Sequence, residues 1–295
     1  MNFTVVTDTS ANLLNRQIRD YGLQVIPFSY FIEGRECTCL DTDAFNGEAF
    51  YALLKNGTKV TTSQIVPEAY IRCFRPILES GRDVIFVSMS SGISGSCQSA
   101  VLAANDLSEQ FPDRRIEIID TLGASLGQGL IALRAAELRD AGTGTAEAAG
   151  LLRSLSARMF NVFTVDNLLY LRRGGRLSNL SAIVGTVLNI KPILKGSSEG
   201  KIVSFGKVRG RRASIETLAS LYDQEVVSPE NQMIGIAHAG CRGDADYLIS
   251  LLNRNRPPKE ILLVDYEPVT GSHVGPGALA LFFESRPGVR DICRI

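Results

Sequence analysis

Residues 83–110, DVIFVSMSSGISGSCQSAVLAANDLSEQ, contain the transition that decides the fold. The stretch 83–89 is apolar at nearly every position, which is typical of a strand buried on both faces of a sheet. Small, hydroxyl-bearing and glycine residues follow, and residues 96–110 then have the composition of a helix. A buried strand that leads through such a turn into a helix indicates a parallel α/β unit. The turn itself is either an ordinary tight turn or a cradle for an anionic group.

Strand-like and helix-like stretches alternate on both sides of this transition. The expected strands include 3–7, 24–32, 115–120, 161–165, 201–208, 233–239 and 260–269, and the expected helices include 67–80, 129–142 and 213–226. This alternation predicts an α/β fold with mostly parallel strands. The low-complexity stretch 140–150 lies near mid-chain, and we place a domain boundary close after it. We expect two domains, 1–158 and 159–295, with a mostly parallel sheet in the N-terminal domain and a smaller α/β second domain.

The composition restricts the class of protein. The 295 residues, with 45% apolar content, suffice for one large or two medium domains. Lys+Arg and Asp+Glu are 31 each, so the chain lacks the basic excess of most nucleic-acid-binding proteins. The N-terminal residues run directly into a strand-like stretch without a signal-peptide pattern, and no run approaches the ~18 apolar residues of a membrane span. We expect a cytoplasmic protein with at most transient membrane contact.

The cysteines and histidines do not predict a metal site. Six cysteines are present without a C-x-x-C pair: Cys37, Cys39, Cys73, Cys97, Cys241 and Cys293. In a chain of this length they indicate reduced thiols rather than disulfides or zinc ligands. The two histidines have no carboxylates nearby at ligand spacing, so we expect no bound metal.

Two hydroxyl-rich loops precede helix starts in the first quarter of the chain. TDTSANL occupies residues 7–13, and TTSQIVPEAY occupies residues 61–70, where Thr62 and Ser63 come before Pro67. Helix N-termini leave backbone N–H groups unpaired and carry partial positive charge, so Ser and Thr at such places usually cap the helix. For 61–70 taken alone, capping is the favoured interpretation and ligand binding is the alternative.

The turn after residue 89 is a candidate anion site. Ser94 supplies a hydroxyl, Gly95 allows close approach of the backbone, and the helix start supplies N–H groups, which together can bind an anion without a formal positive charge. The order of residues is neither the G-x-S-x-G of a nucleophile elbow nor the Gly-Lys-Ser/Thr of a P-loop. A tight turn and an anion site are equally compatible with this stretch.

A further polar loop, TGSHVGPG at the start of 270–283, contains His273. Its glycine-rich surroundings lie between two apolar runs, so a functional role for His273 and a structural one are equally compatible with the sequence. His238 lies at the end of an expected strand, and we interpret it as structural.

Two basic clusters, YLRRGGRLS and GKVRGRRAS, lie at turns that contain glycine. Their candidate contact residues are Arg172, Arg173, Arg176, Lys207 and Arg209. A phosphate or an acidic partner could reach such turns, although a solvated face is the favoured interpretation for most of these cations. Residues 177–194 follow the first cluster, and their small and apolar side chains form either core or the wall of a pocket for a long apolar ligand.

In their types and order, these segments resemble the DegV family over essentially the whole chain. The matching segments are TDTSANL, TTSQIVPEAY, SSGISGSCQSA, DTLGASLGQGL, DNLLYLRRGGRLSNLSAIVGTVLNIKPIL, GKVRGRRASIETL, AHAGCRGDADYL and GSHVGPGALALFF. Each motif alone is weak, whereas their common order is specific. The resemblance implies a two-domain α/β fold with a long-chain fatty acid between the domains. It places the carboxylate in the hydroxyl-rich loops and the tail in a closed apolar tunnel.

The resemblance also implies the residues that contact this ligand. The fatty-acid contacts fall on Thr62, Ser63, Ser94, Gly95 and His273. The fatty acid is a ligand, and no catalytic residue, metal or cofactor is implied. Thr9, Cys97 and Thr121 depart from the residues that are common in the family, and Cys97 could reshape the pocket wall. The preferred chain length and unsaturation are therefore not implied.

A partner protein is implied as well. In some bacteria such proteins present the fatty acid to a separate fatty acid kinase, and the acyl phosphate then feeds phospholipid synthesis. Arg172, Arg173 and Arg176 match the R-R-G-G-R segment of the family, and Lys207 and Arg209 match the G-K-x-R segment, near the tunnel mouth or the kinase.

Two other functions remain as alternatives to this non-catalytic carrier. A serine hydrolase acting on acyl esters would use Ser94, His273 and an acid such as Asp120 or Asp265 in the chain order of an α/β hydrolase, although the nucleophile elbow is absent. A nucleic-acid or regulatory protein would use the arginine clusters, but zero net charge and few aromatic residues in loops disfavour it. We favour the carrier because donors are present without a paired base or metal.

Overall fold

The computed structural model describes residues 3–177 and 189–292. Its contacts divide the chain into a first unit, residues 1–45 and 60–156, and a second unit, residues 46–59 and 157–295. Near mid-chain the division falls after Ser156, two residues before the expected boundary at 158. The second unit also takes residues 46–59 from the N-terminal half, so it is comparable in length with the first unit rather than smaller.

A four-stranded parallel sheet forms the centre of the first unit. Its order is β2-β1-β6-β7, with β1 at Phe3–Asp8, β2 at Gln24–Ile26, β6 at Asp83–Ser88 and β7 at Ile116–Asp120. Every neighbouring pair is parallel, as expected for this unit. The carboxyl ends of these strands share one edge of the sheet, which is where open α/β sheets bind ligands.

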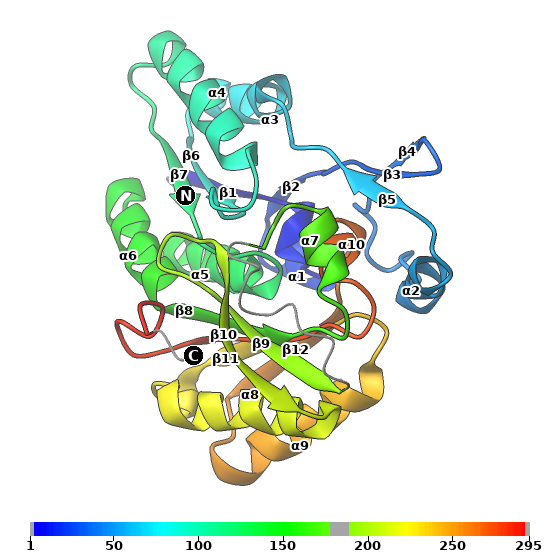
Figure 1. Cartoon of the computed structure of the whole chain (residues 1–295). Helices are drawn as coiled ribbons and strands as arrows, with labels where there is room; N and C mark the ends of the chain where they lie inside the picture. Colours follow the sequence, from blue (N-terminus) through cyan, green and yellow to red (C-terminus); the bar gives the residue numbers. More distant parts are fainter. Residues whose placement is uncertain (1–2, 178–188, 293–295) are drawn as a thin grey trace. The chain divides into compact units, whose positions relative to one another are not determined.

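The helices of the first unit surround this sheet. They are α1 (Asn15–Asp20), α3 (Pro67–Glu79), α4 (Ser96–Gln110), α5 (Leu126–Asp140) and α6 (Thr145–Arg158). Helices α3 and α4 lie side by side, and α5 packs on β1 and β6 (Figure 1). The expected helices at 67–80, 96–110 and 129–142 are confirmed to within a few residues.

The expected strand 24–32 is wrong as a single strand. Residues 24–26 form β2, whereas Tyr30–Ile32 form β3 in a separate antiparallel sheet with β4 (Arg35–Cys37) and β5 (Val60–Thr62), in the order β4-β3-β5. The break lies at Pro27, which cannot donate to a ladder, and the next N–H, that of Phe28, donates to Thr9 Oγ1 at 3.0 Å. In this small sheet β5 pairs with β3, and the polar segment that follows Thr62 begins where β5 ends.

A six-stranded sheet forms the centre of the second unit. Its order is β10-β9-β8-β13-β11-β12. The strands are β8 (Met159–Thr164), β9 (Ile190–Gly196), β10 (Ile202–Arg209), β11 (Met233–His238), β12 (Glu260–Asp265) and β13 (Leu279–Glu284). Among these described strands only β11 and β12 pair in parallel, so the expectation of mostly parallel strands is wrong for this unit. The short connection between β9 and β10 requires an antiparallel pair, and β13 lies antiparallel between β8 and β11.

The second unit also contains α2 (Gly47–Lys55), α7 (Leu169–Arg173), α8 (Arg211–Glu225), α9 (Arg242–Asn255) and α10 (Pro268–Val274). Helices α8 and α9 pack together on one face of the sheet (Figure 1). The core between these helices and the sheet is rich in aromatic side chains. Phe283 packs edge-on against Phe160 and Tyr222, with ring-centroid distances of 5.6 and 5.1 Å. Such pairs add stabilisation beyond the area that they bury.

Two tyrosines join α2 to the second unit. Tyr51 Oη donates to the Tyr266 carbonyl at 2.6 Å, and Tyr170 Oη donates to the Leu54 carbonyl at 3.0 Å. These long-range bonds explain why residues 46–59 group with the C-terminal half of the chain, although the sequence places them between strands of the first unit.

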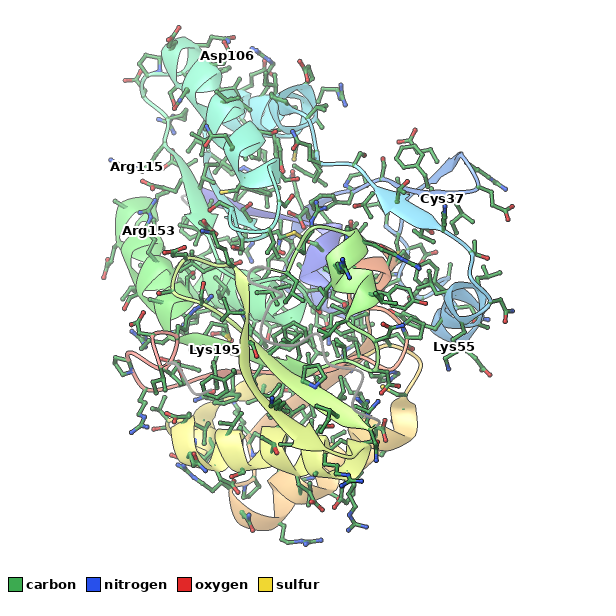
Figure 2. All side chains as sticks on the ribbon, viewed as in Figure 1. Cys37, Lys55, Asp106, Arg115, Arg153 and Lys195 are labelled. Carbon is green, nitrogen blue, oxygen red and sulfur yellow. The ribbon has the colours of Figure 1, made fainter. Side chains whose placement is uncertain are left out.

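Lys195 holds the chain end against the second sheet. Its side chain, labelled in Figure 2, is 2% exposed, and Nζ donates to the carbonyls of Val289, Arg290 and Ile292 at 3.1, 2.7 and 2.6 Å. The ammonium also lies 4.9 Å from the Phe205 ring centroid. A buried ammonium is tolerated because several acceptors surround it.

Candidate functional site

The start of α4 brings the hydroxyls of the first transition together. Ser94 Oγ donates to Ser96 Oγ at 3.0 Å and accepts from the Ser96 N–H at 3.2 Å. The Ser94 N–H donates to the Ser90 carbonyl at 3.1 Å, which closes the turn. Ser94 is half-buried, whereas Ser96 is fully buried. The N-cap residue of α4 is Gly95, and the half-buried Ser94 side chain just before it accepts from the first N–H of the helix.

The segment after β5 is tied to the same helix start. The Ile65 N–H donates to Ser96 Oγ at 3.1 Å, and the Ser63 N–H donates to the Ser29 carbonyl at 3.2 Å. Ser96 therefore connects two polar segments that are far apart in the sequence, and it places both of them at the N-terminus of one helix.

The capping interpretation of residues 61–70 is wrong. Helix α3 begins at Pro67, and its N-cap residue is Val66, which makes no side-chain cap bond. Thr62 instead ends β5 opposite Tyr30, and Ser63 is exposed in the turn that follows. Their hydroxyls are separated from α3 by residues 64–66.

Gly95 allows the Gln64 side chain to lie against the start of α4. A Cβ at position 95 would come within 2.2 Å of Gln64 Oε1. The Gln64 amide reaches Ser99 Oγ on the next turn at 3.5 Å. Gly95 thus lets the segment 61–65 cross the helix start closely, whether or not its own N–H contacts a ligand.

A buried polar network lies at the end of β1. Asp8 is fully buried, and its Oδ1 accepts from the Ser10 hydroxyl, from the Ser10 N–H at 3.0 Å and from Gln128 Nε2 at 3.0 Å. Gln128 Nε2 also lies 3.1 Å from the Val87 carbonyl, so the network joins β1, β6 and α5. Burial raises the pKa of Asp8 to about 6, although the hydrogen bonds from Ser10 and Gln128 oppose this shift.

Tyr70 of α3 lies close to both this network and the hydroxyl turn. Burial raises the pKa of Tyr70 far above its ordinary value, the charge of Asp8 raises it further, and Ser96 lowers it. Its ring packs edge-on against Phe86 of β6 at 5.0 Å. The buried carboxyl of Asp8 therefore lies near the hydroxyl groups at the start of α4, with Tyr70 close to both.

In the second unit, His273 lies in the last turn of α10 and not in a loop. Pro268 occupies the first turn, where its missing N–H does no harm, and the buried Glu267 is the N-cap. Glu267 accepts from the N–H groups of Val269 and Thr270, each at 2.6 Å. This capping makes a helix from residues whose glycine content predicted a loop.

The imidazole of His273 lies against the R-R-G-G-R segment. A Cβ at Gly174 would come within 2.3 Å of His273 Nδ1. Burial lowers the pKa of His273 to about 4, and the charge of Arg176 lowers it further. At neutral pH the ring is therefore uncharged and can donate one hydrogen bond and accept another. The structure thus brings His273 and Arg176 together within the second unit.

The other candidate cations lie on the surface of the second unit. Arg172 and Arg173 are exposed on α7, and Lys207 and Arg209 are exposed on β10, the edge strand of the sheet. Charged side chains on an edge strand also oppose pairing with another chain, so a structural role alone would suffice for Lys207 and Arg209.

The acids considered for a hydrolase already have neighbouring partners. Asp265 Oδ1 lies 3.0 Å from Nδ1 of the buried His238, at the ends of the paired strands β12 and β11. Asp120 Oδ1 accepts from the Leu122 N–H at 2.9 Å. The hydrogen bonds of the Ser94 hydroxyl within the described chain are those to Ser96.

The described chain offers little for thiol or metal chemistry. Burial raises the pKa of Cys73, Cys97 and Cys241 to about 11 each, so these groups are thiols and not thiolates near neutral pH. Within residues 3–177 and 189–292, no group of three His, Cys, Asp or Glu side chains could hold a metal ion. In the same ranges, no helix combines the length and apolar character needed to cross a membrane.

Two predictions concern residues outside the described ranges. They are the core or pocket wall expected within residues 178–188 and the reduced thiol expected at Cys293.

These features define an α/β protein of two units with hydroxyl donors gathered at a helix start. The chain belongs to the DegV family: the family model for uncharacterised proteins of this name matches residues 2–286. A DegV domain-containing protein of Clostridium perfringens is 33% identical over 281 residues, which cover 95% of this chain and 97% of that protein.

Solved structures agree with this assignment. The fold is similar to that of a DegV family protein from Thermus thermophilus described as binding fatty acid, with a TM-score of 0.87, 28% identity and coverage of 97% of this chain and 100% of that one. DegV of Bacillus subtilis, described as a fatty acid binding protein, matches with a TM-score of 0.83, 27% identity and the same coverage. The expected family and two-domain α/β fold class are thereby confirmed.

The predicted contact residues do not include Ser96, Asp8 or Gly174, although Ser96 belongs to the hydroxyl-rich turn that was predicted as a candidate anion site. Ser96 follows Ser94 by two residues, so its place in the first turn of α4 was a usable signal. Asp8 directly follows the expected strand 3–7, but its hydrogen bond with Gln128 of α5 could not be predicted locally. The contact of Gly174 with His273 had no local signal, because Gly174 follows α7 whereas His273 lies in α10, about a hundred residues further along the chain.

Proposed function

We propose that the protein binds a long-chain fatty acid and presents it to a fatty acid kinase, with no chemistry of its own. The carboxylate is bound by Thr62, Ser63, Ser94 and Gly95 of the first unit. The main support is a pair of hydrogen bonds: Ser96 Oγ accepts from the Ile65 N–H and from Ser94 Oγ, and so holds both segments at one helix start. Such an arrangement suits a carboxylate because hydroxyls and helix N–H groups can donate to it together.

The relatives support the choice of ligand. The proteins from Thermus thermophilus and Bacillus subtilis are described as binding fatty acids, and this chain covers each of them completely. A carboxylate is costly to bury unless donors surround it, and each charge-assisted bond contributes about 1.5–3 kcal/mol. Each CH₂ taken from water contributes about 0.8 kcal/mol, so the tail dominates the affinity and the hydroxyls fix the orientation.

The remaining assignments belong to the same proposal. His273 contributes a neutral imidazole to fatty-acid binding. Arg172, Arg173, Arg176, Lys207 and Arg209 contact the phosphate or the kinase. The kinase converts the presented fatty acid into an acyl phosphate for phospholipid synthesis in the cytoplasm.

Native mass spectrometry of the purified protein, followed by lipid analysis after denaturation, tests the binding step. We expect one fatty acid per chain and at least tenfold weaker retention in Ser94→Ala, because a charge-assisted bond is lost. Ser91→Ala is the matched control, since Ser91 is an exposed serine of the same turn. The mass of the bare polypeptide, with no uptake of added fatty acids, would contradict the proposal.

The kinase step needs its own experiment. The loaded protein is mixed with a bacterial fatty acid kinase and ATP, and acyl phosphate is measured. We expect product with the wild type and less with Arg173→Ala at unchanged lipid occupancy. Steady turnover of p-nitrophenyl esters that disappears in Ser94→Ala would instead establish the hydrolase alternative.

A further inference from the structure

Strand β8 places buried side chains on both faces of the second sheet. Phe160 and Val162 belong to the core beneath α8 and α9. Since side chains alternate along a strand, Met159, Asn161 and Phe163 point to the opposite face. All three are buried as well, with exposures of 3, 6 and 7%.

The strand register defines the neighbours of Asn161 on this opposite face. Asn161 pairs with Phe282 of β13, which pairs with Gly235 of β11. Paired residues share a face, so these three residues form one row across the sheet. The adjacent row consists, in order across the sheet, of Leu194, Phe163, Ala280 and Ala237. Asn161 is thus the polar member of a buried apolar surface that includes several very small residues.

The Asn161 amide has no partner among the described residues. Neither Oδ1 nor Nδ2 makes a hydrogen bond within this part of the protein, although both atoms are buried. An amide buried without partners is costly, and most native proteins avoid this arrangement. Asp8 of the first unit, by contrast, has several donors around one carboxylate oxygen. The unpaired donor Nδ2 and acceptor Oδ1 of Asn161 therefore indicate that a polar group outside the described residues pairs with them.

We propose that this face of the second sheet binds the acyl chain and that Asn161 selects chains that carry a hydroxyl group. A hydroxyl both donates and accepts, so one such group satisfies Oδ1 and Nδ2 together, whereas a ketone can only accept. The neighbours of Asn161 in its row, Gly235 and Phe282, are apolar and offer no polar group that could pair with the amide. The inference rests on the proposed function and deepens it, because it names a subclass of fatty acid.

Competition between stearic acid and a series of hydroxystearic acids, with the hydroxyl at different carbons, tests this proposal on delipidated protein by native mass spectrometry. We expect one or two positional isomers to bind about tenfold more tightly than stearic acid. In Asn161→Leu, which keeps the branched shape with a somewhat larger volume but removes both polar atoms, the order reverses and stearic acid binds better. Asn161→Ala provides a second variant in case leucine perturbs folding.

Thr164→Val is the matched control. Thr164 lies on the same strand, and its buried hydroxyl also lacks a partner within the described ranges, but it faces the α8 side with Ile193 and Leu279. This variant should keep the wild-type preference. Equal binding of stearic and hydroxystearic acids by the wild type and Asn161→Leu would overturn the proposal and indicate that a water satisfies Asn161. If no fatty acid of either kind binds, the proposed function itself fails.

Discussion

In the first unit the candidate fatty-acid contacts follow the ends of strands, whereas the candidate in the second unit, His273, belongs to a short helix. Ser94 comes soon after β6, and Thr62 ends β5, so a strand sets the position of each. His273 and Gly174 meet because α10 packs on α7, with no strand leading directly to either. Local sequence can therefore reveal the first kind of site, while the second exists only after the helices have packed.

The two units also bury opposite kinds of titratable group. Asp8 in the first unit has a raised pKa of about 6, and His273 in the second has a lowered pKa of about 4, burial being the main cause in both cases. Each group is therefore most easily buried in its neutral form. Acidification should consequently act on the two units in opposite directions.

The largest expected effect comes from breaking the helix contact of the second unit with Gly275→Ala. Gly275 has φ +77°, and a Cβ there would lie 2.3 Å from Cδ2 of Tyr170 on α7. The left-handed backbone contributes about 1–2 kcal/mol, and with the overlap we expect about 3 kcal/mol or more of lost unfolding free energy. Urea denaturation measures this loss.

Gly288→Ala is the control for this change. Gly288 has φ +82°, but no atom lies within 4 Å of the place that a Cβ would occupy, so only the backbone effect should remain. Equal losses in the two variants would show that the contact between α7 and α10 does not stabilise the second unit.

The next largest effect is expected from His273→Ala on ligand binding. The substitution removes one hydrogen-bonding ring but leaves the capped start of α10 intact, so we expect about tenfold weaker retention of fatty acid with an unchanged fold. Lipid occupancy and kinase-coupled turnover are measured beside circular dichroism. Unchanged occupancy together with unchanged turnover would remove His273 from the site and restrict fatty-acid binding to the first unit.

The smallest net effect is the opposite response of the two units to pH, because the two contributions largely cancel in the stability of the whole chain. Between pH 7 and 5 the unfolded His273 takes up a proton that the folded ring does not, so stability of the second unit falls by about 1–2 kcal/mol. Over the same range the folded Asp8 takes up a proton that the unfolded carboxyl does not, so stability of the first unit rises by about 1–2 kcal/mol.

Hydrogen exchange with peptide resolution, corrected for the intrinsic rate at each pH, separates the two responses. Protection should increase around β1 and α5 and decrease around α7 and α10. Asp8→Asn should abolish the first change, and His273→Gln the second. Parallel changes in both units would show that other groups control the acid response.

The parts of the fold that the sequence predicted are those with strong local patterns. The stretch 83–110 forms β6 and α4 as expected, because continuous burial and helix-forming residues leave few alternatives. The hydroxyl groups around Ser94 could be found in the same way, since they follow a strand and begin a helix. Pro27 also indicates a break in the strand. Only the structure shows that the residues before it join the parallel sheet and the residues after it join the antiparallel sheet.

The parts that the sequence could not predict depend on residues distant along the chain. The insertion of β13 between β8 and β11 makes the second sheet mainly antiparallel, and residues 46–59 join that unit through Tyr51 and Tyr170. The capping role expected for Thr62 failed because α3 begins after Val66.

Three features follow from the amino-acid sequence alone: the alternation of strands and helices, the hydroxyl-rich turn at Ser94 and the resemblance to one family. These depend on neighbouring residues, whose periodicity and turn chemistry act over a few positions. Three other features depend on the tertiary fold. Ser96 joins two polar segments, the surroundings of Asp8 and His273 favour their neutral forms, and the amide of Asn161 lacks a partner among the described residues. Burial and hydrogen-bond satisfaction are set by side chains brought together from distant strands and helices, so no local pattern could reveal them.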